Sequence, residues 1–278
     1  MKTLELEDFC LFYASKCEKC HGQKRVQIQG VWYACSCQII ASARWRLNQI
    51  RIHPPELKFL TWDDFTGVIK EQDIQTGMLR IDSVLDAKAK AIAYCYKNGD
   101  ITCPDDLILH KRASEGSNLI IGGEKNSGKT MLAILLIKEI IRTSVIHNVS
   151  LSFEWVSSSE IKAAARWDGV KLIDHARLDE LAEVDFLVID DVDIEVEQVQ
   201  GKSYQHTMPP DRTSLNMLFG QRDLFHRPTI LLCSQRLLRF AESPMYLDTV
   251  SQQWGVEFVH ILTNKKNIVI HLERERLE

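Results

Sequence analysis

One stretch of the chain reads Gly123-Glu124-Lys125-Asn126-Ser127-Gly128-Lys129-Thr130, a complete match to the pattern G-x4-G-K-[ST]. It follows an apolar run at 119–121 that predicts a strand, and it opens a segment at 128–142 that predicts a helix. Glycines in such a loop let backbone N–H groups curl around phosphate, and the N-terminus of the following helix favours negative charge. The motif therefore predicts a phosphate-binding loop rather than an ordinary glycine turn before a helix.

Two residues of the loop have distinct expected roles. The Lys129 amine would reach the β- and γ-phosphates of a nucleotide, and the Thr130 hydroxyl would bind Mg²⁺. We therefore expect ATP and Mg²⁺ as the ligands of residues 123–130.

A second set of polar residues follows two further apolar runs. Residues 186–189 predict a buried strand, and Asp190 and Asp191 follow it directly. Ligands of parallel sheets bind at this end of the strands, so Asp190 is expected to hold Mg²⁺ and Asp191 to orient or deprotonate the attacking water. Asp191 is shorter than the Glu common at that position, which predicts slow hydrolysis. Gln235 follows a strand at 229–233 and would touch the γ-phosphate or the water, unless it is a loop amide without a role.

The second half of the chain alternates short apolar runs with amphipathic segments, which is typical of an α/β fold with a parallel sheet covered on both faces. The expected strands lie at 119–121, 149–155, 186–189 and 229–233, and the expected helices at 128–142, 159–165 and 212–226. Residues 256–262 and 267–272 flank Asn264-Lys265-Lys266 and predict an antiparallel hairpin at the end of the chain.

The first half contains a cluster of four cysteines. Cys17 and Cys20 are separated by two residues, and Cys35 and Cys37 by one. Paired short spacings predict a tetrahedral zinc site, with a small ribbon at 26–28 and 31–33 between the pairs and a helix at 38–51 after them. The spacing of Cys35 and Cys37 is shorter than usual and predicts a tight turn, with His21 or His53 as a replacement ligand. The alternative is four reduced thiols without metal.

Composition and charge limit the class of protein. Of 278 residues, 45% are hydrophobic and 26% are charged, which excludes a disordered chain. The longest apolar run, 131–137, is too short to cross a bilayer, and the acidic start does not resemble a secretory signal, so a cytoplasmic protein is expected.

The net charge is −4, yet residues 1–60 hold nine Lys and Arg against five Asp and Glu. This asymmetry predicts two modules with different partners.

Three regions are therefore expected. Residues 1–51 would form a zinc-binding module that recruits a partner, 52–115 a linker and helical lead-in, and 116–278 the nucleotide-binding core. Ile52-His53-Pro54-Pro55 marks the first boundary. The lead-in would contribute apolar anchors at Phe59, Trp62 and Phe65, and then a helix over 73–97 that ends at Asn98-Gly99.

The order of phosphate loop, paired aspartates and polar strand tip resembles AAA+ ATPases. Residues 216–229, with Arg222 and the sequence Arg227-Pro228-Thr229, are similar to the DnaC/DnaI/IstB group, and the resemblance spans about 52–262. It implies an ATP hydrolase that acts as a helicase loader, whose zinc module grips a replicative DNA helicase. It also implies single-stranded DNA as a partner, and a homo-oligomer in which Arg222 reaches the γ-phosphate held by a neighbouring subunit. The alternative for Arg222 is a pair with Asp223 or Glu242 on a solvated face.

Two departures from the group leave other functions open. Residues 243–254 lack the further Arg that the group usually carries, and Arg236 and Arg239 do not occupy the matching position. Residues 195–211 form a longer insertion than expected. One alternative is an IstB-like ATP-dependent transposition helper that acts on duplex DNA. A basic helical or winged head would favour this alternative, whereas a zinc module favours a helicase partner. Another is a nucleotide-gated binding protein that barely hydrolyses ATP.

Overall fold

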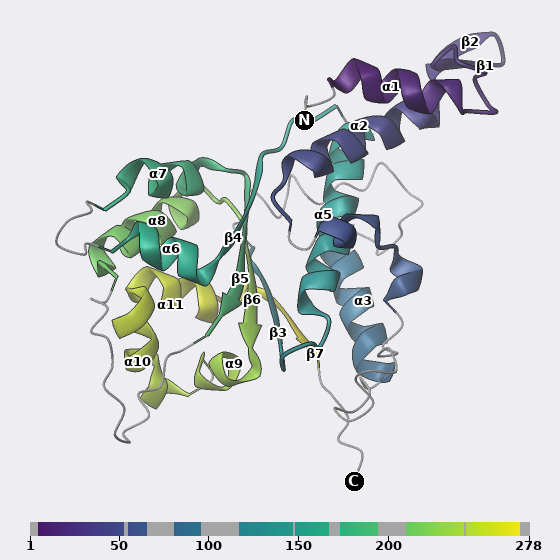
Figure 1. Cartoon of the computed structure of the whole chain (residues 1–278). Helices are drawn as coiled ribbons and strands as arrows, with labels where there is room; N and C mark the ends of the chain where they lie inside the picture. Colours follow the sequence, from purple (N-terminus) through teal and green to yellow (C-terminus); the bar gives the residue numbers. More distant parts are fainter. Residues whose placement is uncertain are drawn as a thin grey trace.

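A computed structural model describes residues 5–52, 55–65, 81–95, 117–146, 148–166, 173–193, 210–241 and 243–272. A central sheet separates two groups of helices, and a small module that begins with α1 lies at one end of the molecule (Figure 1). None of the helices within these ranges is both long and apolar enough to span a membrane.

The sheet contains five strands, all parallel, in the order β4-β5-β6-β3-β7. This confirms the expected α/β class with a parallel sheet. The strand that precedes the phosphate loop, β3, has neighbours on both sides, so the loop emerges from the interior of the sheet. The strands are β3 (Leu119–Gly123), β4 (Phe153–Ser157), β5 (Phe186–Val192), β6 (Thr229–Ser234) and β7 (Ile268–Leu272).

Helices cover both faces of the sheet. On one face lie α3 (Ile81–Cys95) and α5 (Lys129–Ile146). On the other lie α6 (Ser158–Ala164), α7 (His175–Glu183), α8 (Arg212–Leu224), α9 (Gln235–Ala241), α10 (Pro244–Trp254) and α11 (Val256–Thr263). Helices α7, α9 and α10 were not among the helices expected from the sequence. Of the expected helix at 73–97, residues 81–95 are helical, while its start and its Asn98-Gly99 end lie outside the described residues.

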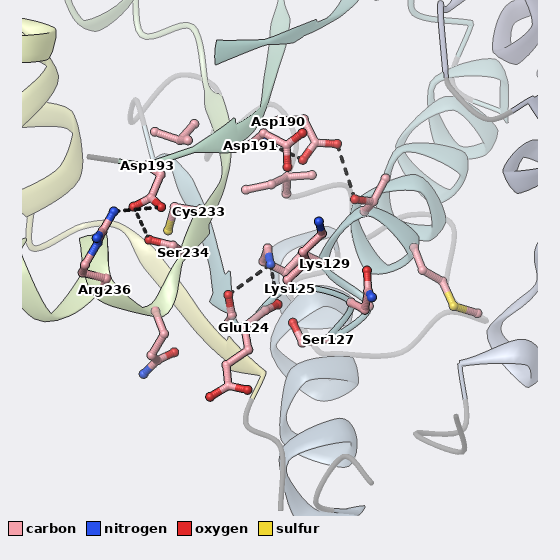
Figure 2. Close-up of a pocket in the computed structure, with 18 of the residues that line it drawn as sticks. Glu124, Lys125, Ser127, Lys129, Asp190, Asp191, Asp193, Cys233, Ser234 and Arg236 are labelled. Carbon is pink, nitrogen blue, oxygen red and sulfur yellow. Dashed lines mark hydrogen bonds and ion pairs between the residues drawn. The ribbon is translucent and has the colours of Figure 1, made fainter. Parts of the chain in front are cut away.

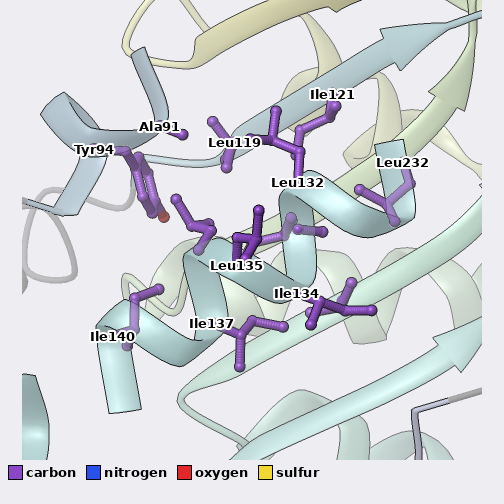
Figure 3. Packing of buried hydrophobic residues seen from close by; sticks show 14 of the residues in the cluster. Ala91, Tyr94, Leu119, Ile121, Leu132, Ile134, Leu135, Ile137, Ile140 and Leu232 are labelled. Carbon is purple, nitrogen blue, oxygen red and sulfur yellow. The ribbon is translucent and has the colours of Figure 1, made fainter. Parts of the chain in front are cut away.

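Two apolar clusters, one on each face, form the core. Side chains of β3 alternate between them, because Leu119 and Ile121 belong to the cluster under α5 while Ile120 belongs to the other. Figure 3 shows Leu132 and Leu135 of α5 packed beside Leu119. These apolar contacts fix α5, and therefore its first residues Lys129 and Thr130, at the end of β3.

The expected hairpin at the end of the chain is wrong. Residues Val256–Thr263 form α11, and β7 pairs in parallel with β3, with Ile268 opposite Leu119. The buried residues of α11 are Phe258, Ile261 and Leu262. Their spacing of three and four residues suits one face of a helix, whereas a strand would alternate sides.

The N-terminal module consists of α1 (Leu6–Ser15), the antiparallel ribbon β1 (Arg25–Ile28) and β2 (Val31–Ala34), and α2 (Ser36–Gln49). Helix α2 also contacts the core. Its Arg46 Nη1 donates to Ser144 Oγ at 3.1 Å and to the carbonyl of Val149 at 2.8 Å. Leu47, Ile50 and Ile52 join the apolar cluster under α5. The proposed boundary at residue 51 thus falls where the chain is already packed against the core.

The lead-in contains two 3₁₀ turns, η1 (Pro55–Phe59) and η2 (Trp62–Asp64). Phe65 is buried, and Trp62 Nε1 donates to Glu139 of α5 at 3.3 Å. Phe59, in contrast, is an exposed side chain, so it is not the expected anchor. It is the last residue of η1, and it is not among the residues of the apolar cluster under α5.

Candidate functional site

The sheet register brings the loop and the carboxylates to one place. Gly123 at the end of β3 lies opposite Ser234 at the end of β6, and β5 is the next strand along. A cavity of about 940 Å³ opens at this carboxyl edge (Figure 2). All of residues 123–130 line it, and so do Asp190, Asp191, Asp193, Ser234, Gln235 and Arg236.

The loop has the close backbone packing that its glycines predict. A Cβ at Gly123 would lie 2.5 Å from Ser127 Oγ and 2.6 Å from the Leu272 carbonyl oxygen, so no side chain fits there. Gly128 has φ +91°. These positions accept glycine alone without strain, and the loop is held in a tight curve beneath the cavity.

Polar groups in the loop suit a phosphate ligand. Lys129 Nζ donates to the carbonyls of Gly123 at 3.0 Å and Glu124 at 2.7 Å, which holds the ammonium inside the curve of the loop. Among the described residues, Ser127 Oγ is a buried hydroxyl without a hydrogen-bond partner. A buried orphan donor beside a cation is a feature that a bound phosphate would satisfy.

A β-bulge positions the paired aspartates. Ile189 lies opposite Leu231 and Val192 opposite Cys233, so Asp190 and Asp191 together face the single residue Leu232. Asp191 takes φ +55°, in the left-handed region. Bulges are frequent beside active sites because the extra residue turns side chains in a new direction.

The carboxylate of Asp190 lies beside the loop. Its Oδ2 accepts from Thr130 Oγ1 at 3.4 Å, and its Oδ1 accepts from the Asp191 N–H at 2.8 Å. Burial raises the pKa of Asp190, and the charge of Asp191 adds to this effect. A hydroxyl and a carboxylate at this spacing are oxygen ligands of the kind that Mg²⁺ prefers. Both residues therefore fit the metal that a bound triphosphate would bring.

Asp191 and Gln235 occupy different parts of the cavity wall. Asp191 is exposed, and its carbonyl accepts from Ser158 Oγ at 2.7 Å, which fixes the backbone while its carboxylate remains at the cavity. Gln235 begins α9, and its Oε1 is a buried oxygen without a hydrogen-bond partner among the described residues. The cavity thus contains two orphan polar atoms, one in the loop and one at the tip of β6.

Sequence reasoning missed Asp193 and did not place Arg236 in the cavity. Asp193 Oδ1 accepts from Ser234 Oγ at 2.6 Å, and its Oδ2 accepts from Arg236 Nη2 at 3.2 Å (Figure 2). The bulge sets Asp193 beside Ser234, and no local sequence pattern reports a bulge in advance. The one feature of the sequence that could have indicated Asp193 as a cavity residue is its position two residues after Asp191.

The structure contradicts the expected role of Arg222 in a neighbouring subunit. Its side chain is 0% exposed. The guanidinium donates to the carbonyls of Leu181 and Val184, each at 2.8 Å, of Pro228 at 2.6 Å, and to Thr229 Oγ1 at 3.0 Å.

Arg222 is thus an interior residue that satisfies carbonyls at the end of α7 and at the start of β6. It cannot reach a neighbour's phosphate without leaving the core, and it does not lie on a solvated face either. Burial lowers its pKa to about 9. Other arginines in this region include Arg227, which donates to the Ala182 carbonyl, Arg236 at the cavity, and Arg239, which is exposed on α9.

The four cysteines converge in the N-terminal module. Their sulfur atoms all lie within 4.8 Å of one another, with 3.6 Å between Cys17 and Cys35 and 3.7 Å between Cys20 and Cys37. Four thiolates around zinc at about 2.3 Å would lie about 3.8 Å apart, whereas a disulfide would need about 2.05 Å. The donor set therefore fits tetrahedral zinc.

The four cysteines are the expected ones, and only the backbone around the close pair differs from the expectation. Cys35 precedes α2 and Cys37 lies in its first turn, so the start of a helix, rather than a tight turn, brings the close pair together. His21 is exposed and is not part of the cluster, and His53 lies outside the described residues.

No protein-family model matches the chain, and no curated protein matches it in sequence. Solved structures resemble it in fold. The crystal structure of DnaI is 16% identical with a TM-score of 0.45, over 80% of this chain and 96% of that chain. The DnaC helicase loader is 17% identical with a TM-score of 0.36, over 59% and 84%. AMPPCP-bound DnaA from Aquifex aeolicus is 18% identical with a TM-score of 0.36, over 60% and 43%.

Proposed function

We propose that this chain is an ATP-dependent helicase loader. In this proposal residues 1–51 bind a replicative DNA helicase, and residues 116–278 bind and hydrolyse ATP to place that helicase on DNA. The single observation that carries the proposal is the cavity at the carboxyl edge of the sheet, where the 123–130 loop meets two aspartates beside Thr130. The motif order that resembles the DnaC/DnaI group supports the choice of partner.

The roles of the core residues follow from their positions. Lys129 would exchange its two loop carbonyls for phosphate oxygens, which are stronger acceptors because they are charged. Mg²⁺, when bound with the nucleotide, neutralises phosphate charge. Thr130 and Asp190 would hold it, and Asp191 would orient the attacking water. Because Asp191 has a short side chain, hydrolysis is expected to be slow.

The packing of the two modules suggests how the partner could respond to nucleotide. Helix α5 begins at Lys129, and its far end carries Ser144, which accepts from Arg46 of the zinc module. Fifteen residues of helix separate the two positions, a rigid distance of about 22 Å. A shift of α5 on ATP binding would therefore move α2 with it.

Co-purification with a replicative helicase tests the proposal. The wild-type chain is expected to capture the helicase, and ATP is expected to change the amount captured. Cys17→Ser is expected to lose capture while ATP binding remains, whereas Lys129→Ala should lose the effect of ATP. Capture of a transposase on duplex DNA in place of the helicase would favour the IstB-like alternative, and binding of neither would contradict both.

The proposal also includes single-stranded DNA as the nucleic-acid partner and a homo-oligomer as the assembly. Light scattering with and without ATP, and fluorescence anisotropy with labelled single and double strands, measure these two properties directly. Arg222 has no part in the proposed assembly, because its guanidinium is fully occupied in the core.

A further inference from the structure

An ion pair lies at the wall of the cavity, on the side of α9. Arg236 Nη2 lies 3.2 Å from Asp193 Oδ2, and both side chains are about half exposed, at 46% and 47%. An exposed pair of this kind contributes little to folding, typically under about 1 kcal/mol. The position of this ion pair at the cavity wall is therefore a better guide to its role than its contribution to folding.

The strand register brings Arg236 close to the phosphate loop. Gly123 lies opposite Ser234, so the segments that follow these two residues leave the sheet at the same edge. Arg236 and Lys129 accordingly line the same cavity. Figure 2 shows the Arg236 side chain directed at Asp193, with Ser234 beside the same carboxylate.

The charges of the cavity make Arg236 a candidate for the terminal phosphate. The lining contains four acidic residues, which are Glu124, Asp190, Asp191 and Asp193, and three basic ones, which are Lys125, Lys129 and Arg236. A triphosphate adds negative charge to this set. Arg can bind a phosphate through two parallel N–H donors, whereas the contact of Arg236 with Asp193 is a single one, from Nη2 to Oδ2.

Asp193 has hydrogen bonds that do not depend on Arg236. Its Oδ1 accepts from Ser234 Oγ at 2.6 Å, and its carbonyl accepts from Trp254 Nε1 at 3.3 Å. Neither contact involves Arg236. The Ser234 hydroxyl thus holds the carboxylate, and Trp254 holds the backbone of the same residue, while the arginine changes partner.

From this geometry we infer that Arg236 binds the γ-phosphate of a nucleoside triphosphate in the same subunit, and that Asp193 positions it in the nucleotide-free state. The inference rests on the proposed nucleotide site. Arg236 would then discriminate between a nucleoside triphosphate and a diphosphate. A diphosphate has no γ-phosphate, so Arg236 would stay paired with Asp193.

Binding affinities for two ligands test this inference. MgADP and the magnesium complex of a β,γ-methylene analogue of ATP are titrated into the wild-type chain and into Arg236→Ala. The variant is expected to lose roughly tenfold to a hundredfold in affinity for the analogue, as for a charge-assisted hydrogen bond, and to keep its affinity for ADP. Arg239→Ala is the matched control, since Arg239 is exposed on the same helix and does not line the cavity. It should change neither affinity.

Asp193→Asn tests the positioning role, because it keeps an acceptor for Ser234 and removes the charge that competes for Arg236. It is expected to raise affinity for the analogue alone, and to have no such effect in the Arg236→Ala background. An Arg236→Ala variant that keeps the wild-type ratio of the two affinities, or loses both equally, overturns the inference while the nucleotide site stands. A wild-type chain that binds neither ligand contradicts the nucleotide site itself.

Discussion

Individual residues of the site owe their positions to backbone geometry at two points. One is Gly123, where the loop leaves β3, and the other is the bulge at Asp190 and Asp191. At Gly123 the nearest atoms include a carbonyl oxygen of β7, so the position belongs to the core as well as to the site. A side chain there would disturb both.

Gly123→Ala is expected to abolish ATP binding and to destabilise the fold by about 1–3 kcal/mol, the usual cost of overpacking. The physical reason is a Cβ 2.6 Å from the Leu272 carbonyl oxygen, which cannot move without moving β7. Gly220→Ala is the control. Its Cβ would meet only the Glu257 side chain, 3.5 Å from Cγ and 3.9 Å from Cδ, and Ala is the better helix former, so stability should rise by about 0.5–1 kcal/mol. Thermal unfolding and ATP titration of both variants measure this, and an unchanged Gly123→Ala protein would contradict the packing.

Arg222→Ala is expected to destabilise the protein by about 3 kcal/mol or more. It removes the donors to buried carbonyls at Leu181, Val184 and Pro228 and leaves a cavity in their place. Denaturant unfolding measures the change. Arg222→Lys should recover only part of it, because one ammonium cannot replace the planar set of donors.

If Arg222 acted instead in the active site of a neighbouring subunit, Arg222→Ala would have the opposite effects. Stability would then stay at the wild-type value, and only hydrolysis that depends on protein concentration would fall. That result would contradict the interior position of the guanidinium.

The sequence predicted some of these residues and not others, for a physical reason. The phosphate loop is a local structure, so its glycines, lysine and threonine are visible in eight consecutive residues. The environment of Arg222 depends in part on the end of α7, where Leu181 is 41 residues away in sequence and meets it only in the folded chain. Asp193 and Arg236 meet because of a bulge, which sequence patterns do not report.

At the scale of elements, buried strands flanked by helices were predicted well and the last segment was not. Residues 256–262 contain a short apolar run, and such runs are compatible with a strand or with a buried helix. The helix is favoured here because Phe258, Ile261 and Leu262 pack together against the second cluster. The helix α7 was missed because its apolar residues are few, at Leu178, Leu181 and Ala182.

The zinc cluster is the element whose stability is expected to depend on metal. Structural zinc contributes about 10–16 kcal/mol in small zinc-binding peptides, and the apolar core of this module contains little besides its cysteines and Ala14. Cys17→Ser, or a chelator, should therefore unfold α1 and the β1–β2 ribbon. Metal analysis should return one zinc per wild-type chain, and a fully folded module without metal would contradict the assignment.

The core provides the control for the zinc experiment. Its two apolar clusters do not contain any of the four cysteines, so ATP binding and the main unfolding transition should persist in Cys17→Ser. Hydrogen exchange locates the change, with protection lost in α1 and retained in α5. Loss of protection throughout the core would show that the module and the core do not fold separately.

Across the whole molecule, the junction of α2 and α5 connects the zinc module to the phosphate loop. Arg46→Ala removes both hydrogen bonds across that junction, to Ser144 and to Val149. We expect zinc and ATP binding to remain, and the effect of ATP on partner capture to fall. Arg44→Ala is the control, because the hydrogen bond of Arg44 among the described residues is to Tyr13 within the module. Equal behaviour of the two variants would argue against this route of coupling.

Direct titration of MgATP into the wild-type chain and into Lys129→Ala tests the nucleotide site at residues 123–130. One ATP per wild-type chain is predicted, with a loss of more than tenfold in affinity in Lys129→Ala, because the ammonium that the loop holds beneath the cavity is removed. Thermal unfolding of the nucleotide-free variant checks that it remains folded. Equal affinity in the two proteins, or no binding to the wild-type chain, would contradict the assignment of this cavity to ATP.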